Sequence, residues 1–146
     1  MADLIRNHKA SFNYELLDRY EAGLELLGPE VKSIRTGHGS LEGARVVIRG
    51  GEGYLVGAII PAYQPANTST DYDPARTRRL LLSKSELATL VGTSERQRLT
   101  LIPLAVYNKG RRLKLGFAVA RGKKKHDKRE TIKKREAARD IDRDRF

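Results

Sequence analysis

The sequence predicts a mainly β fold: a closed antiparallel barrel of about six short strands with small flanking helices, followed by a basic tail. Two observations carry this prediction. Apolar, strand-like runs occur in pairs around glycine-containing turns, and large apolar residues become scarce after Gly122. We therefore divide the 146-residue chain into a folded body, residues 1–121, and a C-terminal tail, residues 122–146.

Four of the expected strands form two hairpins. They are residues 44–49, 54–60, 99–107 and 112–120. The first pair flanks Gly50-Gly51-Glu52-Gly53 and the second flanks Asn108-Lys109-Gly110-Arg111, and both turns have the composition of hairpin connections. Pro103 has no amide hydrogen to donate, so we expect its strand to lie at a sheet edge or to contain a bulge.

Two helices are indicated by their end signals. One begins at Ser83, where Ser83 and Glu86 match a capping box, and is expected to end at Gly92. A shorter one has Pro29 at its first position and Gly37 just beyond its last turn.

Residues 14–27 fit two patterns. Some of their leucines have helical spacing, whereas Leu24 and Leu26 alternate as in a strand. Gly23 costs a helix about 1 kcal/mol relative to alanine. We favour a strand here.

The charge is strongly basic and concentrated at the C-terminus. The formal net charge is +11, and residues 121–146 hold 12 basic and 6 acidic side chains. This balance favours a polyanionic partner. No apolar run is long enough to span a membrane, residues 1–6 lack the apolar segment of a secretory signal, and there is no cysteine. We expect a cytoplasmic protein that does not associate with membranes.

The chemistry of an enzyme is missing. The chain has 3 histidines, and none has a second ligand at metal-binding spacing, so we expect no metal, no cofactor and no catalytic residues. Phosphate-loop and nucleophile-elbow patterns are also absent. Glu21 and Glu25 form a carboxylate pair, but such pairs are usually solvated surface features.

Two basic clusters point to RNA. Arg76, Arg78 and Arg79 follow a long connection, residues 61–75, and guanidinium groups suit phosphate contact and base stacking. The competing interpretation is that these arginines only solvate one strand face. The second cluster begins the tail, which alternatively serves only as a solubilising extension. We expect the tail to be disordered, or helical on binding.

Five segments in this order and spacing resemble a known family, the small protein B or SsrA-binding proteins. They are Asn7-His-Lys-Ala10, Tyr20-Glu-Ala-Gly-Leu24, Gly28-Pro-Glu-Val-Lys-Ser-Ile-Arg35, Asp73-Pro-Ala-Arg-Thr-Arg-Arg-Leu-Leu-Leu82 and Gly122-Lys-Lys-Lys-His-Asp-Lys-Arg129. The resemblance covers roughly residues 7–130. It implies an oligonucleotide-binding-like barrel of six antiparallel strands, which supports the strand interpretation of residues 14–27.

The resemblance also implies a function. Proteins of this family bind the tRNA-like domain of transfer-messenger RNA and deliver it to stalled ribosomes for trans-translation. Their partners would include small-subunit rRNA at the decoding centre, the empty mRNA channel that receives the tail, and elongation factor Tu in the delivery complex. We expect this chain to act as a monomer and an adaptor, not as an enzyme.

The resemblance implies most of the candidate site residues, and the basic clusters add the others. For RNA binding by the body they are Asn7, Lys9, Glu21, Arg35, Arg76, Arg78, Arg79, Leu81 and Lys114. For ribosome contact by the tail they are Lys123, Lys124, His126, Asp127, Lys128 and Arg129.

Several alternatives stay open at this stage. Glu21 cannot bind phosphate, so it either accepts hydrogen bonds from bases or orients nearby cations, or else it is a buried acid paired inside the barrel. Leu81 either contacts a base or belongs to the core. Charge and composition alone would equally suit a ribosome-associated barrel that binds single-stranded RNA without selectivity.

Overall fold

The computed structural model describes residues 3–64, 66, 71–94 and 99–122, and every structural statement below concerns these residues. The strands are β1 (Asp3–Arg6), β2 (Tyr14–Leu24), β3 (Arg45–Arg49), β4 (Glu52–Val56), β5 (Arg78–Leu81), β6 (Leu99–Lys109) and β7 (Arg112–Gly122). The helices are α1 (Ala10–Asn13), α2 (Gly28–Arg35) and α3 (Lys84–Ser94).

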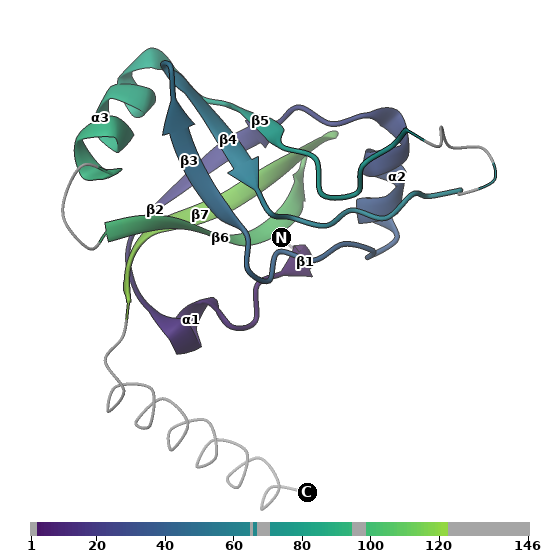
Figure 1. The fold of residues 1–146 in the computed structure, drawn as a ribbon, viewed down its shortest axis with the longest axis horizontal. Coiled ribbons are helices and arrows are strands. Elements are labelled where there is room, and N and C mark those ends of the chain that lie inside the picture. Colours follow the sequence, from purple (N-terminus) through teal and green to yellow (C-terminus); the bar gives the residue numbers. More distant parts are fainter. Residues whose placement is uncertain (1–2, 65, 67–70, 95–98, 123–146) are drawn as a thin grey trace, which may run out of the picture.

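Six of the strands close into a ring in the order β6-β3-β4-β5-β2-β7, with β7 pairing back onto β6 (Figure 1). Every pairing in the ring is antiparallel, and β1 pairs with the part of β6 that lies beyond its pairing with β3. This arrangement confirms the expected closed antiparallel barrel. Closure leaves the ring strands paired on both sides, which removes most of the free sheet edge.

The strand interpretation of residues 14–27 is confirmed by β2, which ends at Leu24. The expected strand 54–60 is wrong at both ends, because β4 begins at Glu52 and stops at Val56. Gly57 follows with φ +84°, a backbone conformation that turns the chain out of the sheet. Gly92 does not end α3, which continues to Ser94.

The short elements β1 and α1, of 4 residues each, were not expected from the sequence. Neither is long enough to show a periodic apolar pattern. Their positions depend on β6, onto which β1 pairs through Ile5 and Arg6.

Pro103 was expected at a sheet edge or at a bulge, and the structure places it at a bulge. Strand β6 has partners on both sides, and its register with β7 shifts between Pro103 and Ala105. The Asn7 side-chain amide donates a 2.9 Å hydrogen bond to the Pro103 carbonyl, and its backbone N–H donates one of 2.7 Å to Leu104. The bulge therefore fixes the chain between β1 and α1.

The barrel interior holds the hydrophobic core. Alternate residues of β7, including Leu115 and Phe117, are fully buried there and pack with Leu80 of β5 and Leu55 of β4. Tyr20 of β2 stacks on Phe117 with ring centroids 5.7 Å apart. Because side chains alternate along a strand, the intervening residues of β2, β6 and β7 point to the outside of the barrel.

A buried carboxylate joins α2 to the irregular segment between β4 and β5. Glu30 of α2 has 0% of its surface exposed. Its Oε2 accepts hydrogen bonds from Arg78 Nη2 at 2.6 Å and from Arg76 Nε at 3.0 Å. Its Oε1 accepts the Leu27 backbone N–H at 2.9 Å, which closes the start of the helix.

Arg78 is as deeply buried as Glu30. Besides Glu30, its guanidinium donates to the carbonyl oxygens of Ala58 and Pro74, each at 2.9 Å. The Tyr72 hydroxyl lies 3.1 Å from Glu30 Oε2 and completes the cluster. Every member is therefore satisfied by hydrogen bonds, which is the condition under which a buried ion pair is tolerated.

Burial by itself would raise the pKa of Glu30, but the hydrogen bonds from Arg76, the Leu27 N–H and Arg78 outweigh it and lower the pKa to about 2. The folded-state pKa therefore lies below the ordinary value of 4.5. Stability contributed by this carboxylate is fully present above pH 4.5 and is lost as the pH falls through about 2.

We expect Glu30→Gln to lower the free energy of unfolding by about 3–5 kcal/mol, because Arg78 stays buried without a charged partner. Urea unfolding measured from neutral pH down to about pH 2 is the test. The wild-type protein should lose stability below about pH 4.5, and the variant should show a shallower acid dependence.

Glu25→Gln is the matched control, because Glu25 also pairs with an arginine, Arg79 at 3.4 Å, but its side chain is 61% exposed. It should change the free energy of unfolding by less than about 1 kcal/mol. Equal losses for the two variants would contradict a special role for the buried cluster.

Candidate nucleic-acid interface

The outer face of β5, β2, β7 and β6 carries a row of paired residues. Leu81 pairs with Gly23, Gly23 with Lys114, and Lys114 with Tyr107. Leu81 is 50% exposed, whereas its neighbour Leu80 is fully buried. The core alternative for Leu81 is therefore wrong, and its side chain belongs to this outer face.

Gly23 allows the leucine to lie flat against the sheet. A Cβ at residue 23 would come within 3.2 Å of the Leu81 Cβ, closer than most real contacts. A hollow of about 260 Å³ lies between β2, β5, β7 and α2, with Gly23 in its lining.

This hollow brings together three of the expected RNA-binding residues from distant parts of the chain. It is lined by Arg35 of α2, Leu81 of β5 and Lys114 of β7. The turn and strand that follow β6 add Arg111 and Arg112. Arg35 Nη2 donates a 2.9 Å hydrogen bond to the Arg111 carbonyl, so α2 and the β6–β7 hairpin meet here.

Arg111 and Arg112 were not among the RNA-binding residues expected from the sequence. Arg111 was expected only in a turn and Arg112 only at the start of a strand, although a double arginine beside a hairpin that also carries Lys114 is a signal for a cationic surface. Together with Arg35 and Lys114, the two arginines give this part of the outer face a dense positive charge.

Glu21 lies on the same outer face, two residues before Gly23. It accepts a short hydrogen bond from the Tyr107 hydroxyl and one of 2.9 Å from Lys109 Nζ. Its side chain is 32% exposed, so the alternative of an acid buried inside the barrel is wrong. The carboxylate is instead a half-exposed acceptor held among cations.

The hydrogen bonds from Tyr107 and Lys109 lower the pKa of Glu21, with a smaller effect from nearby Lys114. Burial and the adjacent carboxylate raise the pKa of Tyr107 to about 12. At neutral pH Tyr107 therefore stays protonated, and its hydroxyl donates a hydrogen bond to the ionised carboxylate of Glu21.

Gly116 gives Tyr107 the space to reach Glu21. A Cβ at residue 116 would lie 3.2 Å from Tyr107 Cε1, so the tyrosine ring rests directly over the glycine. Gly116 also pairs with Glu21 across β2 and β7, which places the carboxylate beside the ring. The position of Glu21 thus depends on a close contact that the sequence pattern does not reveal.

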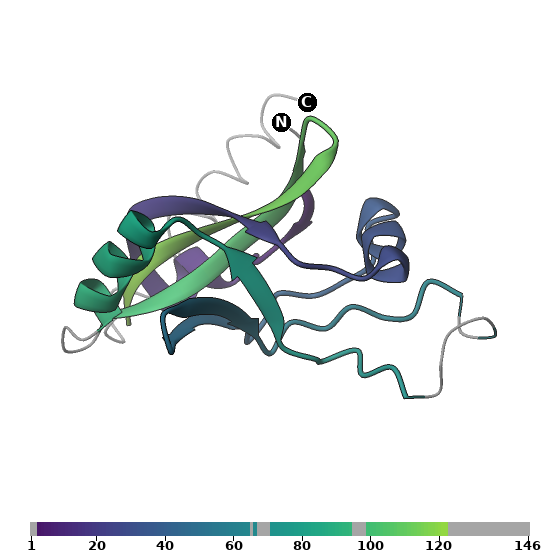
Figure 2. The same cartoon turned by 90° about the horizontal axis from the view of Figure 1, so that it is seen from above.

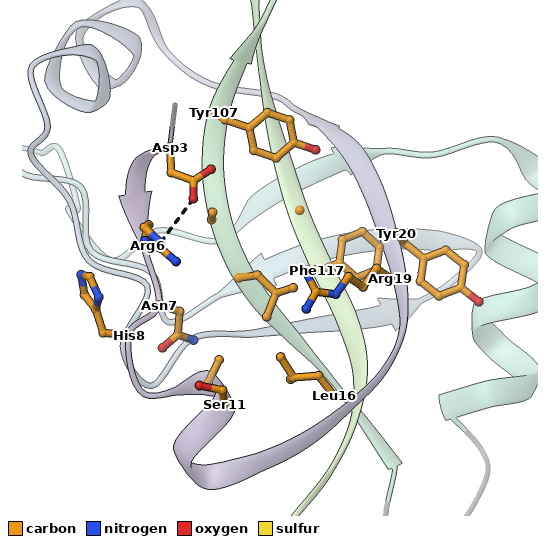
Figure 3. A pocket seen from close by; sticks show the side chains of 14 residues that line it. Asp3, Arg6, Asn7, His8, Ser11, Leu16, Arg19, Tyr20, Tyr107 and Phe117 are labelled. Carbon is orange, nitrogen blue, oxygen red and sulfur yellow. Dashed lines mark ion pairs between the residues drawn. The ribbon is translucent and has the colours of Figure 1, made fainter. Parts of the chain in front are cut away.

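A second, larger cleft of about 710 Å³ adjoins Tyr107 and Gly116 (Figure 3). Polar side chains from the β1–α1 region line one side of it, and Leu16, Arg19 and Tyr20 of β2 line the other (Figure 3). Arg6 pairs with Asp3 at 3.3 Å near its rim.

The structure places Asn7 and Lys9 away from the hollow that holds Lys114. Asn7 lines the larger cleft while its amide nitrogen is bound to the Pro103 carbonyl. Lys9 pairs with Glu42 at 2.8 Å, and both side chains are 62% exposed. The expected RNA-binding residues therefore do not form one cluster.

The expectation for Arg78 needs correction. Its guanidinium is fully buried and bonded to Glu30, so it presents no surface to RNA. Arg76 also forms an ion pair with Glu30, and 30% of its side chain is exposed. Arg79 lies on the surface, where its Nε donates to Glu52 at 3.0 Å. These arginines face neighbouring carboxylates instead of projecting together into solvent.

The tail residues lie outside the described part of the chain. They are Lys123, Lys124, His126, Asp127, Lys128 and Arg129. Within the described ranges, no group of three or more histidine, aspartate or glutamate side chains could hold a metal ion. Nor is any helix among these residues long and apolar enough to cross a membrane.

A closed antiparallel barrel with a cationic outer face is typical of nucleic-acid-binding domains. The family model described as SmpB protein matches residues 4–145, so the chain belongs to the SmpB family.

Named relatives agree with this assignment. The chain is 50% identical over 140 residues to the SsrA-binding protein of Gloeobacter violaceus, covering 96% of this chain and 91% of that protein. It is 46% identical over 137 residues to the SsrA-binding protein of Gloeothece citriformis, covering 94% and 88%.

A solved structure is also similar. The matching chain comes from work described as "tmRNA-SmpB: a journey to the center of the bacterial ribosome". It superposes with a TM-score of 0.69 at 39% identity, covering 87% of this chain and 92% of that one.

We expect Tyr107→Phe to raise the pKa of Glu21 toward its ordinary value of 4.5, because the tyrosine hydroxyl is the largest cause of the lowered pKa. Carboxyl ¹³C chemical shifts followed through an NMR pH titration would measure the change. Tyr54→Phe is the control, since Tyr54 pairs with Val47 and Arg79 on other strands. An unchanged Glu21 pKa in the Tyr107 variant would contradict the proposed hydrogen bond.

Proposed function

We propose that this chain binds the tRNA-like domain of transfer-messenger RNA and delivers it to stalled ribosomes for trans-translation. Membership of the SmpB family supports this function. The observation that carries it is the outer face where Arg35, Leu81 and Lys114, distant in sequence, line one hollow beside Glu21.

The chemistry of this face suits a folded RNA. Arg35, Arg111 and Lys114 supply donors for phosphate oxygens, and arginine can do so with two parallel hydrogen bonds. Leu81 offers an exposed apolar surface for an unstacked base. Glu21 cannot bind phosphate, but its half-exposed carboxylate can accept a further hydrogen bond from a base amino group.

The arrangement favours selectivity as well as affinity. The cations can contact the phosphates of any RNA, and these contacts weaken as the salt concentration rises. A fixed carboxylate, in contrast, forms a hydrogen bond only with a base that presents a donor. Tyr107 and Lys109 hold Glu21 in place before RNA arrives. Preorganisation of this kind reduces the entropy cost of binding.

We infer that the remaining partners follow the same division of the chain. The body, residues 1–121, would hold transfer-messenger RNA, and the cationic tail, residues 122–146, would contact small-subunit rRNA at the decoding centre and enter the empty mRNA channel. Elongation factor Tu would share the delivery complex. The protein would act in the cytoplasm as a monomer, without catalysing a reaction.

Binding selectivity tests the proposed function. At about 150 mM salt the purified protein should bind the tRNA-like domain of transfer-messenger RNA at least tenfold more tightly than an elongator tRNA. Lys114→Gln should lower that affinity and reduce the log–log salt slope by about 0.7–0.9, the loss of one phosphate contact.

Lys84→Gln is the matched control, because it removes one exposed lysine from α3, outside the hollow. It should leave the affinity for the tRNA-like domain nearly unchanged. Equal affinities for the two RNAs would instead favour a ribosome-associated barrel that binds single-stranded RNA without selectivity.

Removing residues 130–146 should separate the two activities. We expect the truncated protein to bind the tRNA-like domain with nearly unchanged affinity, because the hollow lies entirely in the body. Tagging of nascent chains on ribosomes stalled without a stop codon should be abolished in a reconstituted translation reaction. Loss of RNA binding on truncation would contradict the proposed division of labour.

A further inference from the structure

Charged residues and glycines alternate on two neighbouring strands of the outer face. On β2, Gly23 follows Glu21 by two residues, and on β7, Gly116 follows Lys114 by two residues, so all four face the same side of the sheet. Strands β2 and β7 run side by side along the barrel (Figure 2), and their pairing places Glu21 opposite Gly116 and Gly23 opposite Lys114. Each charged residue therefore has a residue without a side chain directly across the strand pair.

The backbone conformation does not require glycine at residues 23 and 116. Neither Gly23 nor Gly116 has a positive φ, so other residues could adopt both conformations. The bulge near Pro103 adds its extra residue to β6, not to β7, and Gly23 lies in a regular stretch of pairing. A glycine inside a strand weakens it and often marks a place where a ligand or another chain segment approaches closely. The space above the strand is therefore what these two glycines supply.

A side chain from the next strand covers each glycine. The Tyr107 ring of β6 lies over Gly116, and Leu81 of β5 lies over Gly23. A Cβ at residue 116 would come within 3.2 Å of Tyr107 Cε1, which belongs to the far part of a side chain, so the ring would be pushed aside. A Cβ at residue 23 would come within 3.2 Å of the Leu81 Cβ, which is attached directly to the backbone of β5. The two glycines thus set how closely Tyr107 and Leu81 approach the sheet.

We propose that Gly23 and Gly116 are specificity-determining residues for the RNA that this face binds. Gly116 acts through Tyr107, whose hydroxyl holds the Glu21 carboxylate. Gly23 acts through Leu81, which stays against the sheet with 50% of its surface exposed. Both glycines are positioning residues, because they contribute no charge and no side-chain hydrogen bond of their own. The inference rests on the proposed function and adds the residues that determine which RNA is bound.

The cations of the face do not depend on these glycines. Lys114 forms no ion pair within the described ranges, and the Glu21 carboxylate accepts its hydrogen bonds from Tyr107 and Lys109. An alanine at residue 23 or 116 therefore leaves every positive charge in place. Phosphate contacts and their salt dependence should persist, whereas the fixed groups that distinguish one base from another should be displaced.

The experiment measures the affinity of the full chain for the tRNA-like domain of transfer-messenger RNA and for an elongator tRNA. Gly116→Ala should bind the tRNA-like domain about tenfold more weakly, the lower end of what a hydrogen bond to a charged group contributes. Its affinity for the elongator tRNA and its log–log salt slopes should match those of the wild type. Gly23→Ala should also bind the tRNA-like domain more weakly, with unchanged slopes.

Gly92→Ala is the matched control. Gly92 is exposed on α3, has no positive φ, and leaves nothing within 4 Å of an added Cβ. The same change from glycine to alanine should therefore leave both affinities unchanged.

The pKa of Glu21 shows whether Gly116 acts through Tyr107. Gly116→Ala should raise this pKa toward 4.5, because the tyrosine hydroxyl is the largest cause of the lowered value. The double variant G116A/Y107F should bind the tRNA-like domain no more weakly than Gly116→Ala alone, since both changes remove the same hydrogen bond. If Gly116→Ala fails to fold, Tyr107→Phe keeps the ring and should show the same loss of selectivity.

Two outcomes would overturn the inference while the proposed function stands. One is retained selectivity in Gly116→Ala and Gly23→Ala, and the other is equal weakening of both RNAs, which would show that the glycines serve only the fold. Additive losses in G116A/Y107F would contradict the route through Tyr107. A wild-type protein that binds the two RNAs equally would refute the proposed function, and this inference with it.

Discussion

The rest of the structure depends on the buried ion pair between the Glu30 carboxylate and Arg78. The carboxylate lies at the start of α2 and binds arginines that follow the long irregular segment after β4. The same helix buries Ile34 in the core and bonds Ser33 Oγ to the Pro61 carbonyl at 2.9 Å. Arg35 reaches the β6–β7 hairpin only because α2 is held in this place. A structural ion pair thus positions a residue of the proposed RNA-binding face.

Arginines divide into two kinds in this protein, and burial decides which kind each is. Arg78 is withdrawn from solvent and satisfied by a carboxylate and backbone carbonyls, so its charge serves folding. Arg111 and Arg112 line an open hollow, so their charge is available to a ligand. A count of cations along the sequence therefore predicts too much exposed positive charge near residue 78 and too little near residue 111.

Local sequence signals predicted most of the strands and the two longer helices, because turns, caps and apolar periodicity act between near neighbours. The cluster of Arg35, Leu81 and Lys114 came only from the resemblance to a family, because strand register and helix docking bring these residues together over long separations. The pairing of Glu30 with Arg78 could not be predicted at all. It depends on a contact between residues 48 positions apart, one of which looks like a surface cation in sequence.

Closure of the six-stranded ring places β7 opposite β4, so the hollow around Lys114 opens on one side of the barrel. On the β7 side, a fixed carboxylate lies among cations, which suits recognition of particular bases. An adaptor must hold one RNA selectively, and phosphate contacts alone do not distinguish one RNA from another. The position of that carboxylate follows from Gly116, in the middle of β7, because the missing side chain leaves room for the Tyr107 ring that holds Glu21.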